Sequence, residues 1–284
     1  MENVLHSPEA AGCSYAIMNC HYVRYPVEYF LDSVKRFGFA NIELFGALPH
    51  FYIEDVDDEL IGRVTAGCRQ RGLNIVSYTP AQGAYPVSIS IDEKTARSRS
   101  IRMAKKSIET AEKLGAATML ISPGFGYQNQ PHEARWYLCR EALEELAEHA
   151  QAHNIILMIE PLTPTTSNVI NTSEQSAKMI AEVGSPNLKS MMDIGVMNFM
   201  GESVDSYFAN LGENLAYIHF TDGPGMHVAL GDGTFPMVDY LKQIRQHGYH
   251  GYLSFEINDK RYLRDPDSAT QKNVSWLKKN GFIG

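Results

Sequence analysis

The residues "ILMIEPLTP", at positions 156–164, carry the first clear indication of the architecture. An apolar run over 155–159 ends on an acid, Glu160, and a proline and a polar loop follow at once. A run this short and this apolar is typical of a buried strand. A carboxylate at the end of such a strand costs free energy unless another group compensates its charge. The pattern therefore predicts a buried strand that delivers Glu160 to a site where its charge has a partner.

Seven further apolar runs are similar to this one, and together they predict eight strands. The expected strands span 13–18, 41–45, 74–79, 118–122, 155–160, 188–193, 215–220 and 252–256. Between them, apolar residues recur every three or four positions, which is the spacing of a helix that packs on one face. Most of these helical segments end in a glycine, such as "QRGLN" and "KLGA", which caps a helix in the left-handed conformation.

Eight strands that each precede a helix, in a chain of 284 residues, predict a single (β/α)8 TIM barrel. We expect one domain over residues 1–284, with residues 1–11 as an N-terminal extension. An open, doubly wound sheet is the alternative. It is disfavoured because "MNCHYVRYP", which follows the first expected strand, is not a glycine-rich phosphate-binding loop.

The composition limits the kinds of partner. The chain has 25 basic and 33 acidic residues, a formal net charge of −8, which argues against a nucleic-acid surface and favours a small-molecule partner. No apolar run approaches the roughly 18 residues that a membrane span needs. The first residues show no signal peptide, so we expect a cytoplasmic protein. The four cysteines form no C-x-x-C pair and are expected to be free thiols.

Four consecutive expected strands end in a possible metal ligand. These residues are Glu160, Asp193, His219 and Glu256. The carboxyl ends of barrel strands meet at one rim, where three carboxylates would repel one another and raise each other's pKa. A divalent cation resolves this repulsion, and three carboxylates with one imidazole suit Mn²⁺, Mg²⁺ or Co²⁺ better than a structural zinc site. For each acid alone, a helix cap or half of a salt bridge is the alternative.

Other polar residues are expected near the same rim. Glu43, at the end of the second expected strand, is a candidate either for a substrate contact or for support of the ligands. His50 and Tyr85, with His21, fall in loops above the rim and are candidates for substrate contact. For each of them, an exposed loop residue without a role is the alternative.

The four possible ligands are 33, 26 and 37 positions apart, and this spacing, with several local motifs, resembles a known family. The motifs are "NIELFGALPHFY" (41–52), "YTPAQGAYP" (78–86), "IEPLTPTTSNVI" (159–170), "MMDI" (191–194), and His227 shortly before "GDGTFPM" (231–237). The chain resembles the sugar isomerase/epimerase family of xylose-isomerase-like TIM barrels. Within it, the motifs look like those of the D-tagatose/D-psicose 3-epimerase group and of the fructoselysine 3-epimerase subfamily.

The resemblance implies an isomerase that inverts C3 of a ketose or ketosamine. It implies one divalent metal ion, Mn²⁺ first and Mg²⁺ or Co²⁺ as alternatives, held by Glu160, Asp193, His219 and Glu256. The metal would stabilise an enediolate, and Glu160 and Glu256 would remove and return the proton from opposite faces of C3. The resemblance makes His227 a further candidate for substrate contact. It also implies a homo-oligomer, a dimer or a tetramer.

Three positions depart from the pattern of the ketohexose epimerases. Those enzymes carry a glutamate, a histidine and an arginine around the O1 end of the sugar, where this chain has Thr166, Val196 and Gly225. The missing charged residues favour a ketose with a larger group on C1, of the fructoselysine or psicoselysine type. The loop "SPGFGYQ" (122–128) lacks the histidine of the fructoselysine subfamily, which leaves the exact substrate open.

Several alternatives stay open on the same scaffold. One is a lyase, either a C-glycoside deglycosidase-type enzyme or a dehydratase, and another is a ketose–aldose isomerase that moves a proton between C1 and C2. A phosphodiesterase of the endonuclease IV type is disfavoured because it needs a histidine-rich cluster and the chain is acidic. A non-catalytic binding barrel would have no use for two opposed glutamates.

Overall fold

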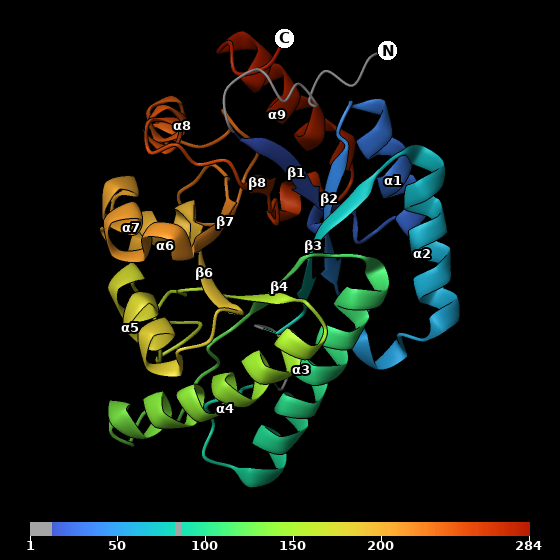
Figure 1. The fold of residues 1–284 in the computed structure, drawn as a ribbon. Helices are drawn as coiled ribbons and strands as arrows, with labels where there is room; N and C mark the ends of the chain where they lie inside the picture. Colours follow the sequence, from blue (N-terminus) through green and yellow to red (C-terminus); the bar gives the residue numbers. More distant parts are fainter. Residues whose placement is uncertain (1–12, 83–86) are drawn as a thin grey trace.

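The computed structural model describes residues 13–82 and 87–284. The expected N-terminal extension over residues 1–11 and the candidate substrate contact Tyr85 lie outside the described residues. Eight parallel strands close into a barrel in the order of the sequence, with β1 paired to β8 (Figure 1). The strands are β1 (Ser14–Met18), β2 (Asn41–Gly46), β3 (Asn74–Pro80), β4 (Thr118–Ile121), β5 (Ile156–Ile159), β6 (Leu188–Asp193), β7 (Leu215–His219) and β8 (Tyr252–Phe255).

The helices surround this barrel (Figure 1). They are α1 (Val27–Arg36), α2 (Asp58–Arg71), α3 (Lys94–Leu114), α4 (His132–Ala152), α5 (Ser173–Val183), α6 (Ile194–Phe199), α7 (Val204–Leu211), α8 (Met237–Gln246) and α9 (Pro266–Lys279). The predicted TIM barrel is confirmed, and each observed strand lies within one or two residues of its predicted span. None of the helices in the described part of the chain is long and apolar enough to cross a membrane.

The expected glycine caps are present at the helix ends. Gly72 after α2, Gly115 after α3 and Gly184 after α5 all have positive φ, at 66°, 75° and 66°. One feature was not expected: α6 follows β6 directly, before α7 completes the β6 unit. Asp193 is the N-cap of α6, because its Oδ1 accepts a hydrogen bond from the backbone N–H of Val196 at 2.8 Å.

The strands have two apolar surfaces. Side chains inside the barrel form a small cluster of Ala16, Val76, Leu120, Met158, Met191 and Tyr217. The other strand residues, such as Leu157 and Ile159 of β5, join the large core between the barrel and the helices. Successive side chains of a strand point to opposite faces, so the residue two positions after each interior residue also points inward. This alternation directs the strand ends into the mouth of the barrel.

Candidate active site

The four predicted metal ligands meet at the carboxyl end of the barrel. Glu160 directly follows β5, Asp193 ends β6, His219 ends β7 and Glu256 directly follows β8. Each of them offers one ligand atom, and all of these atoms lie within 4.8 Å of one another. We call these four residues the barrel cluster.

The strand pattern explains why these side chains converge. Met158, Met191 and Tyr217 fill the barrel interior, and Glu160, Asp193 and His219 each come two residues after one of them. The twofold alternation of a strand therefore points the polar side chains into the barrel mouth. The apolar layer below them lowers the local dielectric and strengthens every charge interaction in the cluster.

His219 lies at the centre of the barrel cluster. Its Nδ1 is 3.1 Å from Oε2 of Glu256, 3.7 Å from Oδ2 of Asp193 and 3.9 Å from Oε1 of Glu160. Nδ1 of His219 and Oδ2 of Asp193 are both buried and have no hydrogen-bond partner among the described residues. Buried polar atoms without a partner are costly. A divalent cation would give both atoms a partner, so the residues present fit such an ion, with a donor set rich in oxygen.

The residues of the barrel cluster shift one another's pKa values. Burial, with the nearby carboxylates of Glu256 and Asp193, raises the pKa of Glu160 to about 8. Burial opposes ionisation of Glu256 too, but the imidazoles of His219 and His227 outweigh it and lower the pKa of Glu256 to about 2. The pKa of His219 lies well above its ordinary value, because the surrounding carboxylates outweigh the burial of the ring. Two glutamates in one site thus have pKa values shifted in opposite directions.

Glu43 lies behind His219 and does not line the cavity. Its carboxylate is fully buried, 3.1 Å from Nε2 of His219, and accepts a hydrogen bond from Oγ1 of Thr79 at 2.5 Å. With Nε2 of His219 directed at this carboxylate, Nδ1 is the ring nitrogen that faces the barrel cluster and is available to a metal ion. The structure therefore favours the supporting role for Glu43 over substrate contact.

The other predicted substrate contacts separate into two groups. His227 lines the cavity, with Nδ1 3.0 Å from Oε2 of Glu256 and Nε2 3.5 Å from Oδ1 of Asp193. His50 is buried away from the cavity, where its ring contacts the side chain of Asn19 at 2.9 Å and the carbonyl oxygen of Tyr25 at 2.6 Å. His21 is fully buried as well, with Nε2 3.2 Å from Oγ1 of Thr270.

A cavity of about 410 Å³ opens above the barrel cluster. Outside the cluster, its polar lining consists of Thr79, Gln82, Ser122, Thr163, Thr166, His227 and Asn258. The sequence had indicated His227 as a substrate contact and Thr166 as a position at the O1 end, and the other five were not expected. Gln82 is held in place at both ends of its amide, since Oε1 accepts from the backbone N–H of Ser122 at 3.0 Å and Nε2 donates to the carbonyl oxygen of Leu120 at 3.2 Å. The cavity is large enough for a sugar-sized molecule.

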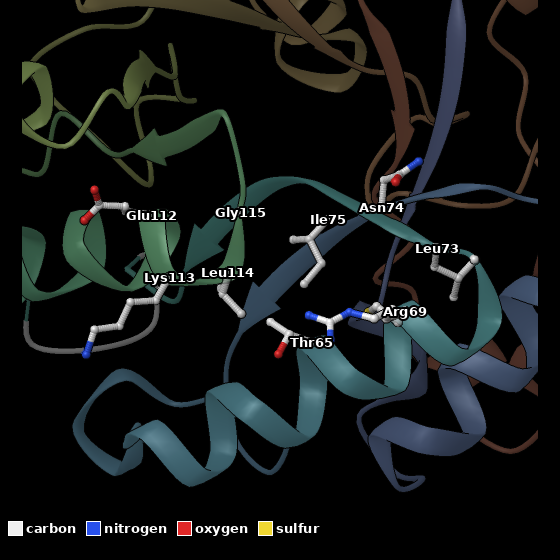
Figure 2. Close-up of a pocket in the computed structure, with 11 residues that line it drawn as sticks. Thr65, Arg69, Leu73, Asn74, Ile75, Glu112, Lys113, Leu114 and Gly115 are labelled. Atoms are coloured by element: carbon white, nitrogen blue, oxygen red, sulfur yellow. The ribbon is translucent and has the colours of Figure 1, made fainter.

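A second hollow, of about 580 Å³, lies at the opposite end of the barrel. It is formed where α2 and α3 end and β3 begins, and Figure 2 shows Arg69, Glu112 and Lys113 among its residues. Its described lining residues do not form a group of converging metal ligands among themselves. Although this hollow is larger, the cavity above the barrel cluster is the better candidate for the active site. That cavity contains the converging ligands and lies at the end where TIM barrels carry active sites.

Comparison with known proteins connects this geometry to a family. A family model described as "Xylose isomerase-like TIM barrel" matches residues 31–280. The fructoselysine 3-epimerase of Shigella flexneri is 31% identical over 88% of this chain and 91% of its own length. The L-ribulose 3-epimerase of Mesorhizobium japonicum is 24% identical over 87% of this chain and 80% of its own length.

Solved structures agree with this fold. A 3-keto-D-glucoside 4-epimerase from E. coli, 17% identical, superposes with a TM-score of 0.80 and covers 94% of this chain and 99% of its own. An L-ribulose 3-epimerase, 21% identical, superposes with a TM-score of 0.78 and covers 94% of both chains. At these identities the likeness shows the fold alone. The sequence relatives confirm the expected class of enzyme, an isomerase that acts on carbohydrates, and this chain belongs to the xylose isomerase-like TIM barrel family.

Proposed function

We propose that this protein is a divalent-metal-dependent sugar epimerase that inverts C3 of a ketose or ketosamine. The observation that carries the proposal is the arrangement of two glutamates: Glu160 and Glu256 line one cavity and belong to one cluster of possible metal ligands. Inversion of a carbon next to a carbonyl needs an acid/base group on each face of that carbon. A pair of carboxylates from β5 and β8 at one barrel mouth meets this need.

The proposed chemistry divides the work between the ion and the side chains. A bound divalent cation, Mn²⁺ first, would polarise the substrate carbonyl and make the C3–H bond more acidic. One of Glu160 and Glu256 removes the C3 proton, and the other donates a proton to the opposite face. In the absence of an ion, burial raises the pKa of Glu160, while the imidazoles of His219 and His227 lower the pKa of Glu256, so the two carboxyls differ in how readily they hold a proton. Asp193 and His219 complete the ligand set.

The cavity favours a ketose with a substituent on C1. Thr166, Val196 and Gly225 all line the cavity, at the positions where ketohexose epimerases carry charged or imidazole groups around O1. None of the three brings a formal charge, and all are small, so this part of the cavity has room for a larger group. The 31% identity to a fructoselysine 3-epimerase supports a ketosamine of that type. The expected dimer or tetramer stays a prediction.

Proton NMR in D2O tests the proposal. Protein loaded with Mn²⁺ is incubated with fructoselysine, psicose, tagatose or a C-glycoside 3-ketone, and the metal is chelated before spectra are recorded. Deuterium at C3 together with a new epimer is the expected result, with fructoselysine the fastest substrate. Deuterium at C1 would instead establish a ketose–aldose isomerase, and loss of the carbon skeleton of the ketone would establish a lyase.

A further inference from the structure

A second group of possible metal ligands lies outside the barrel, on and beside the helices α3 and α4. One ligand atom each from Glu109, His149 and His153 lies within 4.8 Å of the others. Glu109 belongs to α3, while His149 lies in the last turn of α4 and His153 directly follows that helix. Figure 1 shows α3 and α4 side by side on the outside of the barrel. With Glu112, also on α3, these residues are called the α3–α4 cluster.

The helices arrange the α3–α4 cluster in two facing pairs. His149 and His153 are four residues apart, a spacing that places two side chains on one face of a helix. Their ring centroids are 4.7 Å apart, and the rings are tilted by 50°. Nε2 of His149 is 3.2 Å from Oε1 of Glu109, and Nδ1 of His153 is 2.7 Å from Oε2 of Glu112. Both imidazoles therefore face carboxylates of α3.

The neighbouring lysines form their ion pairs with other acids. Lys105, one turn before Glu109, contacts Glu145 at 2.7 Å, and Lys113 contacts Asp58 at 2.7 Å. Figure 2 shows the side chains of Glu112 and Lys113 leaving α3 in different directions. The two histidine side chains are about a quarter exposed, and those of Glu109 and Glu112 are about half exposed, so an ion from solvent can reach them.

We propose that the α3–α4 cluster is a second metal site, which binds one Zn²⁺ ion or a similar late transition-metal ion. Two imidazole nitrogens with one or two carboxylate oxygens form a donor set that Zn²⁺ commonly takes in proteins, with a water molecule to complete its shell. The barrel cluster has one imidazole and three carboxylates, which suits Mn²⁺ or Mg²⁺. Sites rich in nitrogen ligands prefer Zn²⁺ to Mn²⁺ more strongly than sites rich in oxygen ligands do. The two sites therefore differ in the metal they select.

An ion in the α3–α4 cluster would join two neighbouring helices on the outside of the barrel. Zinc–nitrogen bonds measure about 2.0–2.1 Å, so the side chains need small rotations to close on the ion. Partly exposed side chains can make such rotations without disturbing the core. Because the folded state brings these ligands together and the unfolded chain does not, a bound ion stabilises the folded state.

Counting bound Zn²⁺ tests the proposal. The full chain is stripped with EDTA, dialysed against Zn²⁺ and analysed for metal content, as the wild type and as the variant His149→Ala/His153→Ala. We expect the double variant to bind one Zn²⁺ fewer than the wild type. His247→Ala is the matched control, because His247 is a partly exposed histidine that faces a single carboxylate, Asp205, at 2.7 Å. The count for His247→Ala is expected to equal that of the wild type.

Because the result is a difference between two proteins, it does not depend on whether the barrel cluster holds a metal. Equal Zn²⁺ content in the wild type and the double variant would overturn the proposal. Circular dichroism of the stripped proteins checks that the variant is folded. If the double variant does not fold, Glu109→Gln gives a second test by titration calorimetry: at least tenfold weaker Zn²⁺ binding at one site is expected, and an unchanged isotherm would also overturn the proposal.

Discussion

The carboxylate of Glu43 lies 3.1 Å from Nε2 of His219, and both side chains are buried. These residues are 176 positions apart, on β2 and β7. The contact fixes which imidazole nitrogen is free to face Glu160, Asp193 and Glu256. Thr79 of β3 donates a hydrogen bond to the same carboxylate and orients it. Glu43 and Thr79 thus form a supporting layer behind the barrel cluster. Most histidines that bind metals have such a partner on their other ring nitrogen.

Glu43→Gln is expected to weaken metal binding about 10–100-fold, the usual effect of losing such a partner. The amide has the shape of the carboxylate, but its NH2 group can donate to Nε2 of His219 and favour the wrong tautomer. Titration of the stripped protein with Mn²⁺, followed by electron paramagnetic resonance of free Mn²⁺, measures the affinity. Glu59→Gln, an exposed substitution on α2, is the matched control and is expected to bind as the wild type does. If Glu43→Gln binds Mn²⁺ as tightly as the wild type does, Glu43 does not support the metal ligands.

Glu160→Gln is expected to keep the fold and lose activity by about 10²–10⁴-fold, because an amide cannot accept the C3 proton. Glu256→Gln is expected to lose epimerisation to a similar extent. If either variant still exchanges C3–H for deuterium, it should do so for one epimer only, since a single acid/base group then remains. The NMR assay with purified C3 epimers measures both reactions. Near-normal turnover by either variant would contradict its acid/base role.

Removal of the metal is expected to abolish activity and to lower the melting temperature. Without an ion, the carboxylates of Glu160, Asp193 and Glu256 crowd into one buried site. Nδ1 of His219 and Oδ2 of Asp193 then have no hydrogen-bond partner, which is unfavourable. Treatment with EDTA, followed by addition of Mn²⁺, should first remove and then restore both properties. Asp193→Asn serves as the comparison, because it should regain much less activity at the same Mn²⁺ concentration. A fully active chelated protein would exclude the metal from the mechanism.

The sequence predicted those features that depend on residues close together in the chain. The apolar run that ends at Glu160, and its counterparts ending at Asp193 and His219, revealed the strands, and parallel closure of the barrel then brought their ends together. Features that depend on distant contacts were not predictable. Glu43 was expected at the end of its strand, like Glu160, but it lies in the middle of β2, and only the register of the barrel shows that it lies behind His219.

Two other sites illustrate the same limit. His50 follows a strand at the expected rim, but the loop folds inward and buries it against Asn19 and the backbone of Tyr25. The α3–α4 cluster involves histidines with an evident spacing of four in the sequence. Their partners Glu109 and Glu112 are some 40 positions away, as the separations in sequence of 40 and 41 show, and only the packing of α3 on α4 identifies them.

Thr166→Glu tests the proposed preference for a C1 substituent. A carboxylate at this position of the cavity would hold a free O1 hydroxyl, and a hydrogen bond to a charged group contributes about 1.5–3 kcal/mol. We expect the ratio of kcat/KM for psicose to that for fructoselysine to rise at least tenfold. Thr163→Glu, a neighbouring cavity substitution of the same size, is the control for added charge alone. The same ratio in Thr166→Glu as in the wild type would contradict this model of the O1 end.

His21 is expected to make stability depend on pH. Burial lowers the pKa of His21 to about 3, although Asp267 acts in the opposite direction, whereas an exposed histidine in the unfolded chain titrates near the ordinary value of 6.5. Between these two values the unfolded state binds the proton and the folded state does not. The stability that the neutral ring allows is therefore fully present above about pH 6.5 and is lost as the pH falls, by at most about 1.4 kcal/mol per pH unit.

His21→Gln isolates this effect from the many carboxylates that also titrate in acid. The amide can still bond to Thr270 and carries no titrating group, so the variant should lose less stability than the wild type on acidification. Urea unfolding in EDTA at pH 7, 6, 5 and 4.5 measures the free energy of unfolding of both proteins. The difference between them should change by about 2 kcal/mol from pH 6.5 to 4.5, allowing for partial protonation near the upper limit. If the difference in unfolding free energy between the two proteins does not change with pH, His21 takes up its proton in the folded state as readily as in the unfolded state. That result would contradict a neutral, buried ring.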